Sequence, residues 1–407
     1  MDDSLGEEFV PKRPVATSEP YVAHTPGTAL PDKWHLFREH ALATAALAGE
    51  FAAAFGAELL VRFVALVHDI GKLAAEVQVA FRRCAASGGR LGVPHKVEGA
   101  ATSGLFLEVG NLRAAKVVAS VNFGHHYEIP DEDHQTMRVL REMLREPDRI
   151  DEYVALADSL LDVDLRAMAR DIRLPDFSDD VDTANFRAEL FTRMCHSALV
   201  DADFLDTAAH FTSAPSPHRH TDRGMTALRD GFFDYYEARF SQAPPTELNH
   251  LRAGLFDRCV RAGADPQLAA SRRIFRLPAQ TGSGKTMAAA AFALTHAVEH
   301  GKRRVVVAVP FTSITTQNAA EYREAFSALG DDVVLEHHSD IVDDDQAETT
   351  WRRLSAQNWD AEFVVTTTVQ LFESLFSNKP AATRKLHRLA TSTRVRASGP
   401  QEAPKLL

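Results

Sequence analysis

The sequence Leu66-Val67-His68-Asp69-Ile70-Gly71-Lys72 decides how the first half of this chain is interpreted. Its apolar residues indicate a helix, and the adjacent His68 and Asp69 put an imidazole and a carboxylate at a buried position on it. A buried charge is costly unless it meets a cation or a group of opposite charge. The run therefore predicts a buried site that needs a charged partner, and its meaning depends on the histidines elsewhere in the chain.

Further imidazole and carboxylate groups are spread through sequence of helical character. His40 opens an Ala-rich stretch with strong helix propensity, and Asp203 follows the apolar run 197–200. Mixed imidazole and carboxylate ligands suit transition metals or a mixed metal pair, whereas pure oxygen sites suit magnesium or calcium. The candidate ligands exceed what one tetrahedral ion needs, so they predict two ions that share a bridging aspartate and a bridging water. The candidates are His40, His68, Asp69, His95, His125, His126 and Asp203.

This order of His, His-Asp, His, His-His and Asp resembles the HD-type metal-dependent phosphohydrolase superfamily. Within that superfamily, residues 31–210 are similar to the HD nuclease domain of the CRISPR-associated nuclease–helicases of type I interference systems. The Gly124-His125-His126 run, followed by Pro130, is the most family-specific piece. The resemblance implies an all-α domain that hydrolyses phosphodiester bonds with two divalent ions, drawn from Mn, Ni, Co, Fe or Mg.

The resemblance also suggests catalytic roles for two residues of the opening run. Asp69 would bridge the two ions or orient the attacking hydroxide. Lys72 follows His68 at i+4, so its ammonium could face the same site and offset charge in the transition state. An exposed lysine at a helix end is the alternative interpretation of Lys72.

Two ligand assignments have a competitor nearby in the sequence. His35 lies five residues before His40 and could be the first ligand, but the Ala/Leu helix after His40 matches the family pattern better. Asp201 competes with Asp203 for the last carboxylate, and two residues of separation put them on different sides of a helix. Asp203, within Ala-Asp-Phe, stands where the family has its final ligand.

A second signal is Ala279-Gln280-Thr281-Gly282-Ser283-Gly284-Lys285-Thr286, which fills every required position of the Walker A pattern. Glycines let such a loop turn its backbone N–H groups towards phosphate oxygens. The lysine reaches the outer phosphates, and the threonine hydroxyl binds a magnesium ion. A strand over 273–277 and a helix over 287–294 give the expected context. The loop predicts binding of ATP with magnesium through Thr281, Gly282, Ser283, Gly284, Lys285 and Thr286.

The sequence after this loop predicts a parallel α/β domain. The run 304–309 is a continuous β-branched stretch, of the kind that is buried on both faces of a parallel sheet, and 363–365 is a later strand. The segments that follow them, 310–318 and 366–373, resemble strand-end motifs of the first RecA-like domain of DExD/H-box helicases. The stretch 334–339 is typical of the CRISPR-associated branch, and its two histidines are interpreted as strand or loop residues outside the metal site.

The chain departs from the helicase pattern after residue 390. The family would continue into a hydrophobic strand and the acidic Walker B box, but residues 391–404 read as neither. We therefore expect an incomplete RecA-like domain that binds ATP, no helicase or ATPase activity by this chain alone, and a separate polypeptide that supplies the missing helicase parts.

Composition predicts a cytoplasmic protein that does not contact a membrane. The sequence has no apolar span of membrane length and no N-terminal signal, and its three cysteines (Cys84, Cys195 and Cys259) form no disulfide or zinc pattern. A net charge of −11 argues against indiscriminate nucleic-acid binding, because phosphate contacts need local positive charge. Arg82, Arg83 and Arg90 follow the His-Asp helix and are candidates for a DNA path.

These signals predict a multi-domain fold, in which an all-α HD-type domain precedes an incomplete α/β RecA-like domain. The expected divisions are a flexible arm over 1–30, the HD nuclease domain over 31–212, a linker and helical connection over 213–250, the partial RecA-like domain over 251–390 and an aberrant or disordered tail over 391–407.

The resemblance implies a nuclease that cleaves single-stranded DNA exposed by a CRISPR RNA-guided surveillance complex. Two alternatives remain open at this stage. Other HD proteins hydrolyse nucleotides, although such enzymes have no need of an attached Walker A loop. The chain could also be an inactive fragment of an interrupted nuclease–helicase, which the unusual sequence after residue 390 keeps open.

Overall fold

The computed structural model describes residues 12–25, 33–87, 93–126, 128–130, 135–177, 180–211, 222–271, 274–339, 355–396 and 405–406. Contacts between Cα atoms divide the chain into two compact units. The first unit comprises Met1–Pro215 together with Asn378–His387, and the second comprises Ser216–Ser377 with Arg388–Leu407.

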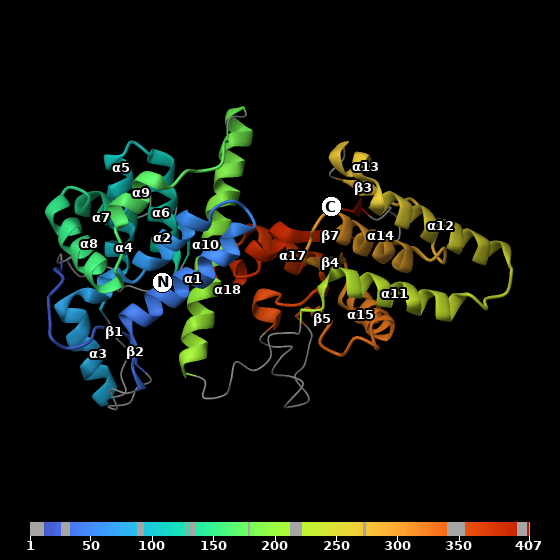
Figure 1. Ribbon diagram of the computed structural model, residues 1–407, viewed down its shortest axis with the longest axis horizontal. Helices are drawn as coiled ribbons and strands as arrows, with labels where there is room; N and C mark the ends of the chain where they lie inside the picture. The colour runs from blue at the N-terminus through green and yellow to red at the C-terminus, as the bar shows by residue number, and fades with distance from the viewer. Residues whose placement is uncertain are drawn as a thin grey trace. The chain divides into compact units, whose positions relative to one another are not determined.

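The first unit is helical (Figure 1). A short antiparallel pair of strands, β1 (Val22–His24) and β2 (His35–Leu36), lies beside its helices. The helices are α1 (Phe37–Ala53), α2 (Glu58–Val67), α3 (Ala75–Ser87), α4 (Lys96–Ala101), α5 (Gly104–Glu108), α6 (Leu112–Gly124), α7 (Gln135–Met143), α8 (Pro147–Leu161), α9 (Leu165–Asp171), α10 (Val181–Phe211) and α18 (Pro380–Thr383), with a 3₁₀ turn, η2 (Ile70–Leu73), after α2.

Small and apolar residues let these helices pack closely around one core. Helix α1 buries its Ala-rich face against α2 and α10, and Phe63 of α2 meets Phe106 edge to face at 4.9 Å between ring centroids. A Cβ on Gly99 would lie 2.7 Å from the carbonyl oxygens of Val67 and His68. Only glycine therefore allows α4 to approach the end of α2, where the His-Asp pair lies.

The second unit contains a six-stranded sheet in the order β3-β8-β7-β4-β6-β5. Strands β5, β6, β4 and β7 are parallel, while β8 runs antiparallel to both β7 and β3. Val307 of β4 pairs with Val365 of β6 and Val395 of β7, in the buried centre of the sheet. The strands are β3 (Phe275–Arg276), β4 (Arg304–Val309), β5 (Val334–His337), β6 (Phe363–Thr367), β7 (Ser392–Arg396) and β8 (Lys405–Leu406).

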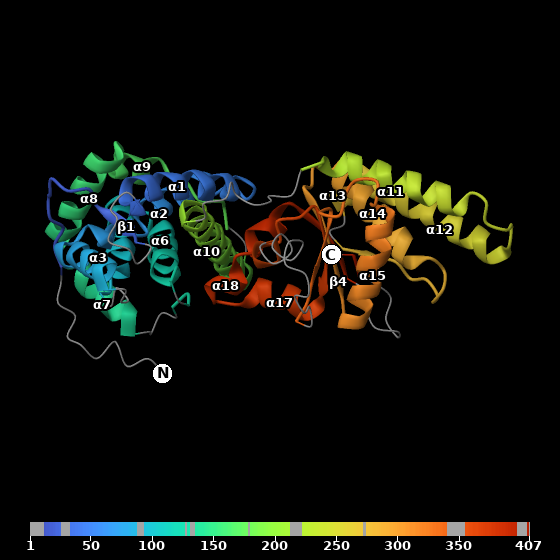
Figure 2. The same cartoon turned by 90° about the horizontal axis from the view of Figure 1, so that it is seen from below.

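Helices accompany this sheet in the manner of an α/β domain. Helix α14 is almost wholly buried because α11 and α12 pack on it, and α15 packs on β5 and β6 (Figure 2). These helices are α11 (Gly224–Phe240), α12 (Glu247–Ala264), α13 (Pro266–Ser271), α14 (Lys285–Glu299), α15 (Thr312–Ala325) and α17 (Thr368–Phe376). A 3₁₀ stretch, η3 (Leu386–Thr391), links α18 to β7.

The predicted order of a helical domain followed by a parallel α/β domain is confirmed, but its divisions need correction. Residues Ser392–Arg396, expected in an unstructured tail, form strand β7 with Thr393 and Val395 buried. Part of the expected arm forms β1, and α11, expected in the connection, contributes Leu228 and Phe232 to the core of the second unit. Residues Asn378–His387 belong to the helical unit. None of the described helices is both long and apolar enough to cross a membrane.

Candidate metal centre and nucleotide-binding loop

Asp69 lies at the centre of the predicted ligand set, between the end of α2 and η2, and its side chain is 1% exposed. One of its oxygens, Oδ2, faces two imidazoles. His68 Nε2 is 3.4 Å from it and His40 Nε2, from α1, is 3.5 Å away. Asp203 of α10 approaches the same group, with its Oδ1 3.4 Å from His40 Nε2. The first half of the predicted set is thus gathered on one side of Asp69.

The other oxygen of Asp69, Oδ1, faces the second half of the set. His95 and His125 each place Nε2 3.7 Å from Oδ1, and His126 places Nε2 3.8 Å from it. The two histidines of the doublet follow the end of α6, and His95 is the N-cap of α4. The structure therefore brings all seven predicted ligands together, with the two oxygens of one carboxylate shared between two imidazole groups.

Hydrogen bonds to backbone carbonyls fix the orientation of three of these imidazoles. His68 Nδ1 lies 2.7 Å from the Ala65 carbonyl oxygen. His95 Nδ1 lies 3.1 Å from the Val93 carbonyl oxygen, and His125 Nδ1 lies 2.5 Å from the Asn122 carbonyl oxygen. A carbonyl only accepts, so Nδ1 carries the hydrogen in each ring. In a neutral ring, Nε2 then has a free lone pair directed towards Asp69, which is the arrangement found in metal-binding histidines.

His40 is oriented in the same way by a carboxylate. Its Nδ1 lies 2.7 Å from Asp206 Oδ2, one turn after Asp203 on α10. Asp206 was not among the predicted site residues. It acts through His40, as carboxylates behind metal-bound histidines commonly do. Its i+3 spacing from Asp203 is the signal that the sequence offered.

Two pairs of ring nitrogens in this cluster lie close to each other. His40 Nε2 is 3.2 Å from His68 Nε2, and His95 Nε2 is 3.1 Å from His126 Nε2. When both rings of a pair are neutral and hold the hydrogen on Nδ1, the facing Nε2 lone pairs repel one another unless a cation lies between them. In addition, neither Asp69 oxygen nor His125 Nε2 has a hydrogen bond to another described residue. The donor set therefore fits a pair of divalent cations.

The electrostatics of the site favour a charged Asp69 and lone pairs on two imidazoles. Burial opposes ionisation of Asp69, but Lys72 and His68 outweigh it and hold the pKa of Asp69 well below its usual range. Burial lowers the pKa of His95 to about 4 and that of His126 well below its usual value. His40 differs: burial lowers its pKa, but the neighbouring carboxylates of Asp206 and Asp69 raise it to about 9, so without a metal ion this ring is protonated.

Lys72 lies inside the site rather than at an exposed helix end. Its side chain is 3% exposed, and its Nζ is 2.5 Å from Asp69 Oδ2 and 3.1 Å from His24 Nε2. The ammonium group therefore lies among the predicted metal ligands and stabilises the charged form of Asp69.

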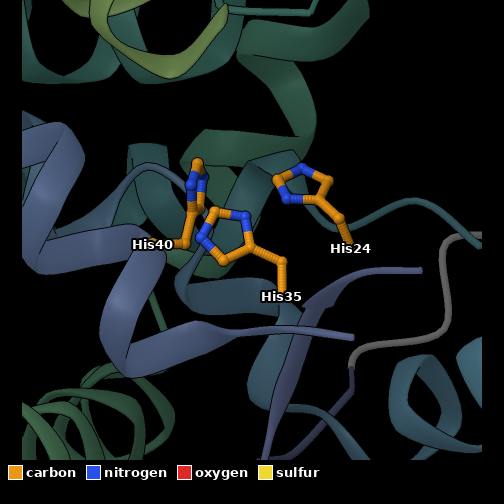
Figure 3. A group of neighbouring side chains, drawn as sticks. All are labelled: His24, His35 and His40. Carbon is orange, nitrogen blue, oxygen red and sulfur yellow. The ribbon is translucent and has the colours of Figure 1, made fainter. Parts of the chain in front are cut away.

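His24 and His35 form a third imidazole group with His40 (Figure 3). One nitrogen from each ring lies within 4.8 Å of the others. His24 comes from β1 and was missed because its segment reads as a flexible arm, although Val22-Ala23 before it is an apolar pair suited to a strand. His35 stacks on His210 at 4.0 Å between ring centroids and contacts Asp206, so it lies behind His40 rather than beside Asp69.

The two competing aspartates on α10 have separate partners. Asp203 faces His40, as described above, whereas Asp201 is fully buried and pairs with Arg384, with 2.9 Å between Oδ1 and Nε.

Of the arginines expected on a DNA path, Arg82 forms an ion pair with Glu19 at 2.5 Å, Arg83 is exposed, and Arg90 lies outside the described residues.

The nucleotide-binding loop lies between β3 and α14 in the second unit. Gly282 and Gly284 both have φ of +81°, a conformation that favours glycine, and Gly284 is the N-cap of α14. Lys285 Nζ donates to the Ala279 carbonyl at 2.9 Å, and the Ser283 hydroxyl donates to the Gln280 carbonyl at 2.6 Å. The loop is thus folded around its lysine at the N-terminus of a long helix, where backbone N–H groups attract phosphate.

The predicted strand-end segments also lie at helix N-termini. Residues 312–318 open α15 after β4, and Thr367 caps α17 after β6 by accepting the Gln370 N–H at 3.2 Å. His338 Nε2 lies 2.9 Å from Glu336 Oε1, and His337 accepts a hydrogen bond from the Trp359 indole, so both have partners within their own unit.

Comparison with known protein families identifies both halves of the chain. Residues 37–161 match the HD domain family, and residues 264–391 match the DEAD/DEAH box helicase family. The chain therefore combines an HD domain with a DEAD/DEAH box helicase domain. No curated protein sequence matches the chain.

Solved structures with a similar fold include those of T. fusca Cas3. The crystal structure of T. fusca Cas3 has a TM-score of 0.59 at 20% sequence identity and covers 93% of this chain, while this chain covers 46% of it. The T. fusca Cas3-ATP structure has a TM-score of 0.58 at 19% identity with the same coverages. The chain thus has a Cas3-like fold and spans about half the length of those proteins, and the predicted resemblance is confirmed at the level of the fold.

Proposed function

We propose that the helical domain is a metal-dependent nuclease that cleaves single-stranded DNA during CRISPR type I interference. The observation that carries this proposal is Asp69, whose two oxygens each face a separate group of imidazole nitrogens at 3.4–3.8 Å. Two divalent ions held in this way suit phosphodiester hydrolysis. The choice of single-stranded DNA as substrate rests on the Cas3-like fold.

In this mechanism, His40, His68 and Asp203 would help to hold one ion and His95, His125 and His126 the other, with Asp69 close to both groups. Bound divalent ions, which could be Mn, Ni, Co, Fe or Mg, supply Lewis acidity towards the phosphate and make water more acidic. Asp206 keeps the His40 ring in the orientation that directs Nε2 inwards. Lys72 adds a positive charge 2.5 Å from Asp69, where it offsets negative charge on the phosphate.

The α/β domain is proposed to bind ATP with magnesium at the loop 279–286. The backbone N–H groups at the start of α14 would contact the phosphates, as would the Lys285 ammonium group. The Thr286 hydroxyl would bind the magnesium ion. The fold also supports an RNA-guided surveillance complex as the partner that exposes the DNA strand. The cytoplasm would be the site of action.

The nuclease proposal is tested with the purified full chain and a labelled single-stranded DNA oligonucleotide. Mn, Ni, Co, Fe and Mg salts are supplied separately, and nucleoside triphosphates and cyclic dinucleotides are run in parallel. We expect cleavage of the oligonucleotide by the wild type, background cleavage by Asp69→Asn, and full cleavage by Asp234→Asn, which changes an exposed aspartate of α11. Hydrolysis of nucleotides without DNA cleavage would contradict the proposal.

The nucleotide-binding proposal has its own measurement. Binding of a fluorescent ATP analogue in the presence of magnesium should saturate with the wild type and be lost in Lys285→Ala, because the lysine is the charge that reaches the outer phosphates. Lys302→Ala, beyond the end of α14, is the matched control and should bind normally. Equal binding by Lys285→Ala would rule out the loop as the site.

A further inference from the structure

Ten residues from late in the sequence, Asn378–His387, are part of the helical unit. At the start of this segment, the Asn378 carbonyl accepts the Ile129 N–H at 3.2 Å, and its side-chain amide donates to Glu128 at 3.2 Å. Residues 128–130 follow the His125-His126 doublet closely in the chain. At both ends the segment continues into the second unit.

The rest of the segment lies along one face of α10. Arg384 pairs with the buried Asp201, and its guanidinium lies 4.7 Å from the centroid of the Phe204 ring. The backbone N–H of His387 donates to Ser197 Oγ at 3.0 Å, and its Nδ1 is 2.9 Å from the same hydroxyl. This face of α10 differs from the one that carries Asp203 and Asp206 to the metal centre, so one helix contacts both the centre and the segment.

A chain of hydrogen bonds leads from the segment to the histidine doublet. His196 of α10 is fully buried, and its Nε2 lies 3.1 Å from the Gly124 carbonyl oxygen. The carbonyl can only accept, so Nε2 carries the hydrogen and Nδ1 of the neutral ring accepts. Thr383 places its hydroxyl 3.2 Å from that Nδ1 and 3.1 Å from the Pro380 carbonyl, so its single hydrogen is shared between these two acceptors. Burial lowers the pKa of His196 to about 4, which keeps this ring neutral.

The carbonyl that His196 holds belongs to the peptide bond between Gly124 and His125. The plane of this peptide sets the direction in which His125 leaves the backbone, because the peptide is rigid. Gly124 has little room to adjust: a Cβ there would lie 3.0 Å from Ile129 Cα. The hydrogen bond from His196 therefore acts directly on the part of the backbone that aims the doublet at Asp69.

We propose that His196 and Thr383 are positioning residues of the metal centre, and that Asn378–His387 thereby belongs to the nuclease site. Thr383 orients the His196 ring, and His196 holds the peptide that directs His125 and His126 towards Asp69 Oδ1. The inference rests on the proposed metal binding by these two histidines. It assigns a function in the helical domain to residues that the sequence places in the helicase half.

The test measures manganese binding by the full-length protein, with calorimetry for affinity and electron paramagnetic resonance for the number of bound ions. Thr383→Val removes the hydroxyl with little change of shape, and His196→Ala removes the ring. Each should weaken binding of one of the two ions by about 10-fold or more and leave the other unchanged, since groups behind metal ligands commonly have effects of this size. His196→Gln, whose amide can donate to the Gly124 carbonyl, should restore much of the affinity.

Thr295→Val is the matched control, because Thr295 is a buried threonine of α14 whose hydroxyl has no hydrogen bond to another described residue. It should bind both ions like the wild type. The inference would be overturned if Thr383→Val and His196→Ala both bound the two ions with unchanged affinity. It would also be overturned if all variants bound both ions more weakly to the same extent, because that result indicates a general structural effect. A wild type that binds two ions yet leaves single-stranded DNA intact would instead contradict the proposed function alone.

Discussion

Asp201 and Arg384 are 183 residues apart in the chain, yet they form a buried ion pair with 2.9 Å between Oδ1 and Nε. The Asp201 side chain is fully buried and that of Arg384 is 7% exposed. His387 Nε2 lies 3.7 Å from the second oxygen of Asp201. This pair ties α10 to the segment Asn378–His387 and explains why Asp201, unlike Asp203, is directed away from the metal centre.

Removal of one partner from this pair should destabilise the helical unit. Arg384→Met leaves Asp201 charged and buried without its main partner, at an expected cost of about 3–5 kcal/mol in the free energy of unfolding. The double variant Asp201→Asn with Arg384→Met removes both charges and should recover part of that loss. Urea unfolding followed by circular dichroism measures both.

The control for this prediction is a surface pair of the same chemistry. Arg229 lies 2.8 Å from Asp230 and both are partly exposed, so Arg229→Met should change the free energy of unfolding by less than about 1 kcal/mol. Equal effects of Arg384→Met and Arg229→Met would show that the buried pair has no special role.

Gly71 should tolerate no side chain. A Cβ on this residue would lie 2.1 Å from the His95 carbonyl oxygen and 2.7 Å from Glu98 Oε2. Gly71→Ala must push His95 away from Asp69, so we expect a loss of about 1–3 kcal/mol in the free energy of unfolding and weaker manganese binding. Gly254→Ala is the control: the nearest atom is 3.9 Å away at a partly exposed position of α12, and alanine should stabilise that helix by about 0.5–1 kcal/mol.

Asp206 should affect metal binding without being a ligand. Asp206→Ala removes the acceptor 2.7 Å from His40 Nδ1, so the ring is free to rotate and Nε2 loses its fixed direction. We expect a loss of about 10–100-fold in affinity for one manganese ion, measured by calorimetry. Asp234→Ala, at an exposed position of α11, should have no effect. An Asp206→Ala variant with unchanged affinity for both ions would refute this role.

The α/β unit should become less stable as the pH rises, because of Glu362. Burial and the neighbouring Asp222 raise the pKa of Glu362 from 4.5 to about 7, while its carboxyl accepts the Gly224 N–H at 2.7 Å and the Arg223 N–H at 3.0 Å. A raised folded-state pKa means that the folded state holds the proton more tightly than the unfolded state. This contribution is therefore present below about pH 4.5 and is lost as the pH approaches 7.

Glu362→Gln removes that pH dependence and keeps an oxygen acceptor for both N–H groups. The variant should be more stable than the wild type by about 1–2 kcal/mol at pH 8 and equally stable at pH 4.5. Thermal melting at the two pH values measures the difference. Glu373→Gln, at an exposed position of α17, is the control, and a stabilisation by Glu362→Gln at both pH values would disprove the titration.

Regular patterns in the sequence were sufficient for the main elements of the fold. The continuous valines of β4 predicted a buried parallel strand, and the Walker A loop predicted its own position before a helix. Strand β7 was missed because Arg394 and Arg396 interrupt its apolar character, although the aliphatic parts of such side chains can be buried. Its place next to β4 depends on the fold of the whole sheet rather than on its own composition.

The candidate metal centre could be anticipated because its predicted ligands have a distinctive order, and the structure gathers the other six around Asp69. His24 and Asp206 were not found, since a single histidine or aspartate carries no pattern of its own. The contact between Asp201 and Arg384 could not be predicted from the sequence either. Its residues come from distant segments without a shared periodicity, and only the three-dimensional packing of the chain joins them.

The inclusion of Asn378–His387 in the helical unit has a practical consequence for anyone who wishes to excise the nuclease. A gene cut after residue 215 would omit the arginine that neutralises Asp201 and would uncover the side of α10 that carries His196, Ser197 and Asp201. A recombinant single-domain enzyme would need these ten residues grafted back, or α10 redesigned with neutral side chains at the positions they shield.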